Sequence, residues 1–231
     1  MLQCAMQFDK AAGRVDGIIL DVDGTIWDTT AVAACAWNKA IAQLAFDVGA
    51  VDSAMLRREF GKPMDEIALD LWPTLGGGQR DVLMRLCQSE EQAALEDATI
   101  EPYPGVVETV RRLAAECAFY VVSNCQAGYI ELMLAKTGLA PHVRDFECFG
   151  RTGMDKAHNI ALLAARNHLV HPVYVGDTRG DALCCAQAGV PFVQAAWGFG
   201  SDEEFADVSV AARIDSFDQL ALLWGADRLG G

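Results

Sequence analysis

The stretch that most constrains the fold of this chain is GIILDVDGT, residues 17–25. The apolar run at its start predicts a strand that is buried on both faces, as in a parallel sheet. Two carboxylates one residue apart, Asp21 and Asp23, follow this run and precede Gly24 and Thr25. Because residues i and i+2 of an extended chain share a face, both carboxylates can address one point in space. In an open α/β sheet that point lies at the carboxyl edge, where ligands bind.

Paired carboxylates at a strand end partly shielded from water repel each other. A bound divalent cation such as Mg²⁺, which takes carboxylate and backbone oxygens as ligands, relieves that repulsion. The alternative interpretation is a strand followed by an acidic turn, because Asp-Gly is common in turns. This stretch alone leaves both interpretations open, and the rest of the chain must decide between them.

The charge balance limits the classes of partner. The chain has 18 basic and 32 acidic residues and a formal net charge of −14. Nucleic acids and anionic lipids are bound through Lys and Arg, so we predict neither a nucleic-acid nor a membrane partner. No apolar run approaches the roughly 18 to 20 residues of a membrane span. If the substrate is a phosphate, a metal ion or basic side chains must supply local positive charge.

The cysteines and the first residues indicate a compartment. Eight cysteines in 231 residues, without a paired Cys-x-x-Cys, indicate neither a disulfide framework nor a zinc site. Residues 1–10 lack the basic and then apolar pattern of a secretory signal. We therefore expect mostly buried, reduced cysteines in a cytoplasmic protein.

The segment after the first strand predicts a helical insertion. Apolar residues recur at helical spacing, and no strand is expected from residue 28 to 98. The helices are expected at about residues 33–44, 52–71 (in one or two pieces, broken at Gly61–Pro63) and 80–95. The three glycines of residues 75–78 predict a flexible joint. This block is expected to lie as a lid above the carboxyl edge of the sheet.

From residue 99 onwards, predicted strands and helices alternate. The expected strands cover residues 119–122, 146–149, 173–175, 191–196 and 211–215. The expected helices cover about 106–117, 130–138, 155–168, 180–188 and 217–224. Alternation of this kind predicts an α/β fold with a parallel sheet and right-handed crossovers. We predict a core domain of residues 1–28 and 99–231 and an inserted helical domain of residues 29–98.

Polar side chains gather at the predicted strand ends. The residues are Asp21 and Asp23 after the first strand, Ser123 and Asn124 after the second, Asp177 and Asp181 after the fourth, and Lys156 near the start of a helix. Because parallel strands end on the same side of a sheet, these side chains are expected in one pocket. Carboxylates with a hydroxyl, an amide and a lysine suit phosphoryl transfer through a covalent aspartyl-phosphate.

The order, spacing and strand context of these motifs resemble the haloacid dehalogenase superfamily. The resemblance is carried by Asp-x-Asp-Gly-Thr at 21–25, Ser123, Lys156 and Gly-Asp-x-x-x-Asp at 176–181. It points to the phosphatase branch with a helical cap inserted after the first strand. Residues 102–106 (PYPGV) are also similar to the return from cap to core in phosphoglycolate-phosphatase-like members. The resemblance implies a Rossmann-like core and a Mg²⁺-dependent phosphatase that acts on a small phosphorylated metabolite, phosphoglycolate or a similar organic phosphate.

The resemblance also implies roles for single residues. Asp21 would be the nucleophile and a Mg²⁺ ligand. Asp23 would be the general acid and then the base, with its main-chain carbonyl, rather than its carboxylate, on Mg²⁺. Lys156 would neutralise charge on Asp21 and on the transferred group. Asp177 would ligate Mg²⁺, and Asp181 would be either a ligand or an acceptor behind the ligands. The implied substrate-binding residues are Gly24, Thr25, Ser123, Asn124 and Lys156.

Several of these residues have a simpler structural interpretation. Ser123 and Asn124 also suit a turn, Lys156 a solvated helix position, and Asp181 a helix cap. Three basic residues of the insertion either contact a carboxylate or second phosphate of the substrate or remain solvated. They are Arg57, Arg58 and Lys62.

Other functions stay open at this point. A phosphomutase of the β-phosphoglucomutase type keeps both acids of the first motif and differs in shielding the aspartyl-phosphate from water. A phospho-receiver module and an inactive binding protein are alternatives of another class. Asp23 argues against a dehalogenase and a receiver, because neither needs an acid for a leaving alkoxide. The sequence does not show the exact phosphomonoester or whether the protein is a monomer or a homodimer.

Overall fold

The computed structural model describes residues 15–223 of the chain. Its strands form one parallel sheet in the order β3-β2-β1-β4-β5-β6. The strands are β1 (Gly17–Leu20), β2 (Ala118–Ser123), β3 (Val143–Cys148), β4 (Pro172–Gly176), β5 (Phe192–Ala195) and β6 (Ala212–Ile214). β1 lies between β2 and β4, so the strand order reverses beside the first motif. In open α/β sheets, ligands bind at this reversal.

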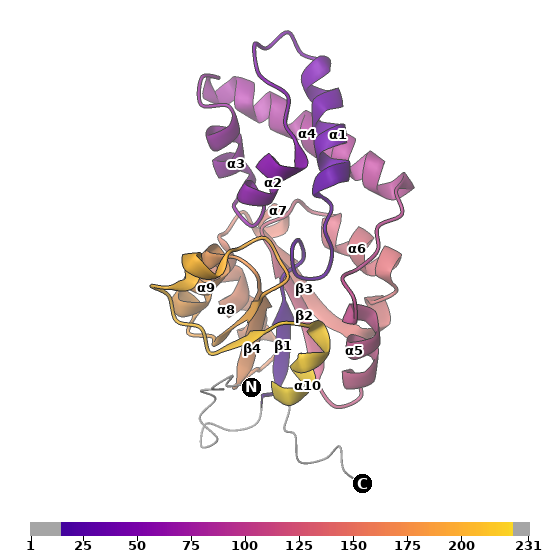
Figure 1. The fold of residues 1–231 in the computed structure, drawn as a ribbon, viewed down its shortest axis with the longest axis vertical. Coiled ribbons are helices and arrows are strands. Elements are labelled where there is room, and N and C mark those ends of the chain that lie inside the picture. The colour runs from indigo at the N-terminus through magenta and orange to yellow at the C-terminus, as the bar shows by residue number, and fades with distance from the viewer. Residues whose placement is uncertain (1–14, 224–231) are drawn as a thin grey trace.

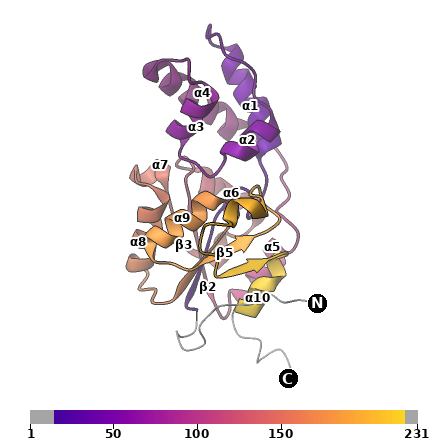
Figure 2. The same cartoon turned by 60° about the vertical axis from the view of Figure 1, so that its left-hand side comes forward.

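Helices cover both faces of the sheet (Figures 1 and 2). Ile18 and Leu20 pack in a cluster with α5 and α6, and Ile19 packs in a second cluster with α8 and α9. This alternation explains why β1 is apolar at every position. The core helices are α5 (Val106–Leu113), α6 (Tyr129–Thr137), α7 (Phe149–Thr152), α8 (Lys156–Arg166), α9 (Arg179–Ala188) and α10 (Leu220–Leu223). Short 3₁₀ turns cover η1 (Ala140–His142), η2 (Asp202–Phe205) and η3 (Phe217–Gln219).

The predicted helical insertion is confirmed, and we call it the cap. It consists of α1 (Thr30–Ala42), α2 (Ser53–Glu59), α3 (Met64–Leu71) and α4 (Gly77–Asp97). The cap stands above the carboxyl edge of the sheet (Figure 1). Its helices share a separate apolar cluster around Trp37, Leu56 and Leu83. Because each part has its own core, we propose that residues 29–98 form a domain apart from 1–28 and 99–231.

The glycine run and the end of the third strand differ from their predictions. The glycine run is not a flexible joint, because Gly76 is the N-cap of α4 and the helix begins at Gly77. The Gly76 N–H donates to Gln79 Oε1 at 3.0 Å, which satisfies one backbone group of the first turn. Glycines lack the side chains from which helical periodicity is recognised. Phe149 also begins α7 instead of ending β3, and Trp224 of the expected last helix lies outside the described residues.

Two predictions from composition can be compared with residues 15–223. All seven cysteines in this range are free thiols. In the same range, every helix is too short or too polar to cross a bilayer.

Candidate active site

The parallel register brings three chain segments to one point at the carboxyl edge. Leu20, the last residue of β1, lies opposite Val121 of β2 and Val175 of β4. Asp21 follows Leu20 directly, and Ser123 and Asp177 lie two residues beyond Val121 and Val175 at the same edge of the sheet. Asp21, Ser123 and Asp177 are all buried at this edge. The structure thus brings Asp21 and Asp177 together, and it places Ser123 beside Asp23 in the lining of one pocket.

Lys156 lies at the centre of the buried charges. Its Nζ donates to Asp21 Oδ1 at 3.0 Å and to Asp181 Oδ1 at 2.5 Å, and the residue is 1% exposed. Lys156 is the first residue of α8, where Asp155 caps the helix by accepting from the His158 N–H. Burial lowers the pKa of Lys156, but Asp181 and Asp21 together raise it well above its usual value. Lys156 is therefore a buried ammonium, and its interpretation as a solvated lysine is wrong.

The two carboxylates that contact this ammonium belong to a group of three. Oxygens of Asp21, Asp177 and Asp181 all lie within 4.8 Å of one another. Burial raises the pKa of Asp21 to about 6 and that of Asp177 well above its usual value. One lysine does not balance three buried carboxylates, so the group favours a further cation. An all-oxygen donor set of this kind fits Mg²⁺, and these residues can hold a metal ion.

Neighbouring groups fix the orientation of Asp177 and Asp181. Asp177 Oδ1 accepts from the Thr25 hydroxyl at 3.2 Å, and its Oδ2 accepts from the Phe199 N–H at 2.7 Å. Asp181 Oδ2 accepts from the Thr178 N–H and hydroxyl at 3.1 and 2.7 Å. Asp181 thus belongs to a capping box of α9 while its other oxygen contacts Lys156. Thr25, predicted to bind substrate, here holds Asp177.

Asp23 lies apart from the three-carboxylate group. Its Oδ1 accepts from Tyr129 OH at 2.6 Å and from the Thr29 hydroxyl at 2.9 Å. Burial is the main cause that raises the pKa of Asp23 to about 7, and the hydrogen bond from Tyr129 lowers it in part. This carboxyl can hold or release a proton near neutral pH, as a general acid and base requires. Its carboxylate is not among the three whose oxygens lie within 4.8 Å of one another.

Sequence reasoning missed the two residues that hold Asp23. Tyr129 is buried in the first turn of α6, with its ring edge-on to Trp27 at 5.7 Å between centroids. A tyrosine six residues after Ser123 has no motif that marks it. Thr29 is the N-cap of α1, and its hydroxyl points to Asp23 instead of capping the helix. The Asp-Thr-Thr run at 28–30 indicates a helix start and gives no sign of this contact.

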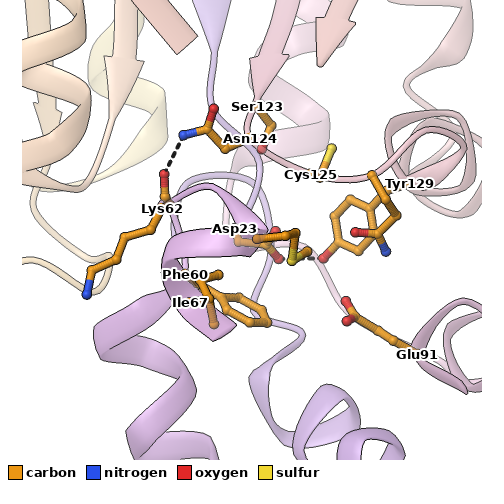
Figure 3. A pocket seen from close by; sticks show the side chains of 12 residues that line it. Asp23, Phe60, Lys62, Ile67, Glu91, Ser123, Asn124, Cys125 and Tyr129 are labelled. Carbon is orange, nitrogen blue, oxygen red and sulfur yellow. Dashed lines mark hydrogen bonds between the residues drawn. The ribbon is translucent and has the colours of Figure 1, made fainter. Parts of the chain in front are cut away.

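A pocket of about 320 Å³, including the part open to solvent, lies between cap and core (Figure 3). We call it the cap–core pocket. The core contributes Asp23, Ser123, Asn124, Cys125, Gln126 and Tyr129. The cap contributes Phe60, Gly61, Lys62, Met64, Ile67 and Glu91.

Asn124 connects the two sides of this pocket. Its Nδ2 donates to the Gly61 carbonyl of the cap at 2.8 Å (Figure 3). Gly61 lies beyond α2, the helix that carries the basic residues Arg57 and Arg58. Arg57 pairs with Asp28 at 2.5 Å, and both arginines are exposed. Neither arginine lines the cap–core pocket, whereas Lys62 does.

Gly24 makes the close approach of Asp177 possible. Its φ is +81°, and a Cβ at this position would lie 2.0 Å from Asp177 Oδ2. Because the family resemblance assigns Asp177 as a Mg²⁺ ligand, we expect Gly24→Ala to displace Asp177 and to lower Mg²⁺ affinity by at least about tenfold. Isothermal titration of Mg²⁺ measures this effect.

Gly128→Ala is the matched control for backbone strain. Gly128 has a φ of +92°, and a Cβ there would have no neighbour within 4 Å. Gly128→Ala should therefore cost about 1 kcal/mol of unfolding free energy and leave Mg²⁺ affinity unchanged. Equal Mg²⁺ affinities in the two variants would contradict the role of Gly24.

Glu91 predicts a pH dependence of stability. It is 1% exposed, its Oε2 accepts from Trp37 Nε1 at 2.7 Å, and burial raises its pKa to about 8 from 4.5. The folded state therefore holds this proton more tightly than the unfolded state. The contribution of the Glu91 carboxyl to the free energy of unfolding is fully present below about pH 4.5 and is lost as the pH rises through about 8.

Glu91→Gln keeps an acceptor for Trp37 and cannot ionise. We expect the variant to exceed the wild type in unfolding free energy at pH 9 by a few kcal/mol, about 3 to 5, and to match it near pH 5. Urea denaturation at both pH values measures this difference. A difference that does not change with pH would show that Glu91 is ionised throughout.

Fold and site together define a capped α/β enzyme with a buried carboxylate centre. Residues 18–195 match the family model described as haloacid dehalogenase-like hydrolase. The chain is 26% identical to a phosphoglycolate phosphatase of Rhodospirillum rubrum, over 93% of this chain and 92% of the relative. It is 30% identical to a phosphoglycolate phosphatase of Caulobacter vibrioides, over 79% of each.

A solved structure shows the same fold. CbbY of Rhodobacter sphaeroides, solved with xylulose 1,5-bisphosphate, aligns with a TM-score of 0.73 and 17% identity over 89% of this chain and 96% of that one. The chain belongs to the haloacid dehalogenase-like hydrolase family. It is a phosphatase of that family, as the motifs predict.

Proposed function

We propose that this protein hydrolyses small phosphomonoesters through a phosphoaspartate on Asp21. The observation that carries the proposal is the position of Lys156, whose Nζ joins Asp21 to Asp181 within a group of three carboxylates. A nucleophilic carboxylate needs its charge balanced before a phosphate dianion can approach. Lys156 supplies part of this balance from inside the protein.

In the first step an oxygen of Asp21 attacks phosphorus and the bond from phosphorus to the ester oxygen breaks. The protonated carboxyl of Asp23 donates its proton to the leaving oxygen, which departs as an alcohol. The raised pKa of Asp23, about 7, supports this role because part of the population is protonated at neutral pH. Tyr129 and Thr29 hold the carboxyl in place through the hydrogen bonds given above.

In the second step the ionised Asp23 takes a proton from water. The water oxygen attacks phosphorus, the bond to Asp21 breaks, and phosphate leaves while the carboxylate of Asp21 is restored. Ser123 and the backbone amides near Asn124 and Gly24 are proposed to bind phosphoryl oxygens. Ser123 lines the cap–core pocket beside Asp23, which supports this placement.

Mg²⁺ is proposed as the resident cofactor. Asp21, Asp177 and the main-chain carbonyl of Asp23 would hold it, with Asp181 as a ligand or as the partner that orients Lys156. When bound, the cation supplies positive charge to the phosphoryl oxygens. The three buried carboxylates and their single lysine support this proposal.

The first test combines metal removal with a substrate screen. We expect phosphate release from a panel of phosphorylated metabolites with Mg²⁺, complete loss in EDTA, and recovery when Mg²⁺ is restored. Phosphoglycolate belongs in the panel because relatives are named for it. A hexose 1-phosphate in the panel distinguishes a phosphatase from a phosphomutase, because a phosphomutase would form the hexose 6-phosphate without releasing free phosphate. Hydrolysis that continues unchanged in EDTA would contradict the proposal.

A further inference from the structure

The charges of the cap–core pocket bear on the substrate's leaving group. Among the described residues that line it, Lys62 is the one cationic side chain. Lys62 Nζ donates to Glu59 Oε2 at 2.7 Å and to Asp70 Oδ2 at 2.8 Å. Figure 3 shows its side chain extending away from Asp23 and Glu91. The ammonium group is thus neutralised outside the pocket.

Two other cationic side chains close to the site are also paired with carboxylates. Arg57 pairs with Asp28 and lies over the Phe199 ring, with its Cζ 5.9 Å from the ring centroid. Lys156 is buried between Asp21 and Asp181. In the part of the chain that the structure describes, the pocket therefore offers no free positive group to an anionic leaving group.

Glu91 supplies no positive charge to the opposite wall of the pocket. Its carboxyl group is directed into the pocket towards Tyr129 (Figure 3), and its Oε2 accepts from Trp37 Nε1. The raised pKa of about 8 leaves it largely neutral at pH 7. A neutral Glu91 gives an anion no charge compensation, and an ionised one repels it. In both protonation states it can accept a hydrogen bond from a hydroxyl.

Neutral polar groups in the pocket lack partners. Gln126 Nε2 and Oε1 and Asn124 Oδ1 are buried atoms without a hydrogen bond within the described residues. Leaving such groups unpaired costs free energy that a bound hydroxyl would recover. Phe60 and Ile67 supply the apolar part of the wall. The pocket thus combines amide groups, a carboxyl and apolar surface.

From these contacts we propose that the substrate is the phosphate ester of an uncharged, hydroxyl-bearing alcohol. Gln126 and Glu91 are then specificity-determining residues, because both can pair with a hydroxyl and neither supplies the positive charge that would balance a carboxylate or a second phosphate on the leaving group. This inference rests on the proposed phosphatase function and narrows its substrate class. It predicts that this chain does not prefer phosphoglycolate, the substrate for which these relatives are named.

The test compares two esters of nearly equal size, 2-hydroxyethyl phosphate and 2-phosphoglycolate. We expect kcat/KM with Mg²⁺ to be at least about tenfold higher for the hydroxyethyl ester, because its hydroxyl can pair with the buried polar groups. Should turnover of both be slow, their inhibition constants against p-nitrophenyl phosphate give the same comparison. A preference for phosphoglycolate in either measurement would overturn the inference.

Three variants test which residues set the ratio. Gln126→Lys places a cation at the pocket and should raise the relative kcat/KM for phosphoglycolate by about tenfold. Gln187→Lys makes the same change on an exposed position of α9 and should leave the ratio unchanged. Lys62→Gln should also leave it unchanged, because its ammonium is paired outside the pocket.

The outcomes separate the two proposals. Loss of phosphoglycolate turnover in Lys62→Gln, or no shift in Gln126→Lys, would overturn the specificity inference alone. If no phosphomonoester, p-nitrophenyl phosphate included, is hydrolysed with Mg²⁺, then the proposed function fails instead. The wild-type comparison decides the inference even where a variant does not fold.

Discussion

Asp21→Asn should abolish phosphate release, by about four orders of magnitude or more, because an amide cannot form the covalent intermediate. The side chain keeps its shape, and its oxygen can still accept from Lys156 Nζ, now 3.0 Å from Asp21 Oδ1. The substitution also removes one of three crowded buried carboxylates. We therefore expect the metal-free variant to be at least as stable as the wild type.

Phosphate release and urea denaturation measure these two effects. Asp47→Asn is the matched control, since it makes the same chemical change on an exposed side chain of the cap. The control should keep full activity. Turnover of Asp21→Asn within about tenfold of the wild type would contradict a nucleophilic Asp21.

Lys156→Met should lose both activity and stability. It leaves Asp21 and Asp181, which lie beside the buried Asp177, without their ammonium partner. Breaking a buried ion pair in this way costs about 3 to 5 kcal/mol of unfolding free energy. Loss of a cation that stabilises the transferred group is expected to lower kcat by about 10²- to 10³-fold.

The pH dependence identifies the cause of this instability. Burial already raises the pKa of Asp21 to about 6 with the lysine present, so removing Lys156 should raise it further. The stability deficit should therefore shrink as the pH falls from 8 to 5 and the carboxylates take up protons. Added Mg²⁺ should also reduce it, because the ion binds the folded state.

Lys39→Met, on an exposed position of α1, controls for the loss of a lysine. It should leave activity and stability near the wild type. A Lys156→Met deficit that is the same at pH 5 and pH 8 would point to lost packing of the lysine stem instead of unbalanced charge.

Much of the core and its charged centre could be predicted because the signals are local. Apolar strands precede Asp21, Ser123 and Asp177. Because these strands are parallel, their polar ends must lie at the same edge of the sheet. The order of the motifs predicts that Lys156 belongs to the site. In the structure its Nζ lies 3.0 Å from Asp21 Oδ1. The apolar composition of β1, β2 and β4 specifies their burial on both faces, whereas β3 carries charged residues and is only partly buried.

The contacts that the sequence did not reveal depend on how separate elements cross. Tyr129 reaches Asp23 from α6, and Glu91 reaches the pocket from α4 of the cap. No spacing rule relates these residues to the strand ends. Thr29 carries the signal of a helix cap, and only the tertiary fold turns its hydroxyl to Asp23.

The glycine run shows a different limit. Gly76 and Gly77 begin a helix because a side-chain oxygen of Gln79 and the cap's packing satisfy the first turn. Intrinsic propensity alone favours a loop there. Packing of α4 against α1, the helix pair at the centre of the cap, outweighs that preference.

The central claim is that Asp21 accepts the phosphoryl group. The most direct test is acid quenching of the wild-type enzyme during turnover with Mg²⁺, followed by mass spectrometry of its peptides. We predict that the mass of one phosphoryl group appears on the peptide of residues 17–25 and localises to Asp21. Its appearance on another residue, or its absence while phosphate is released at full rate, would contradict the account.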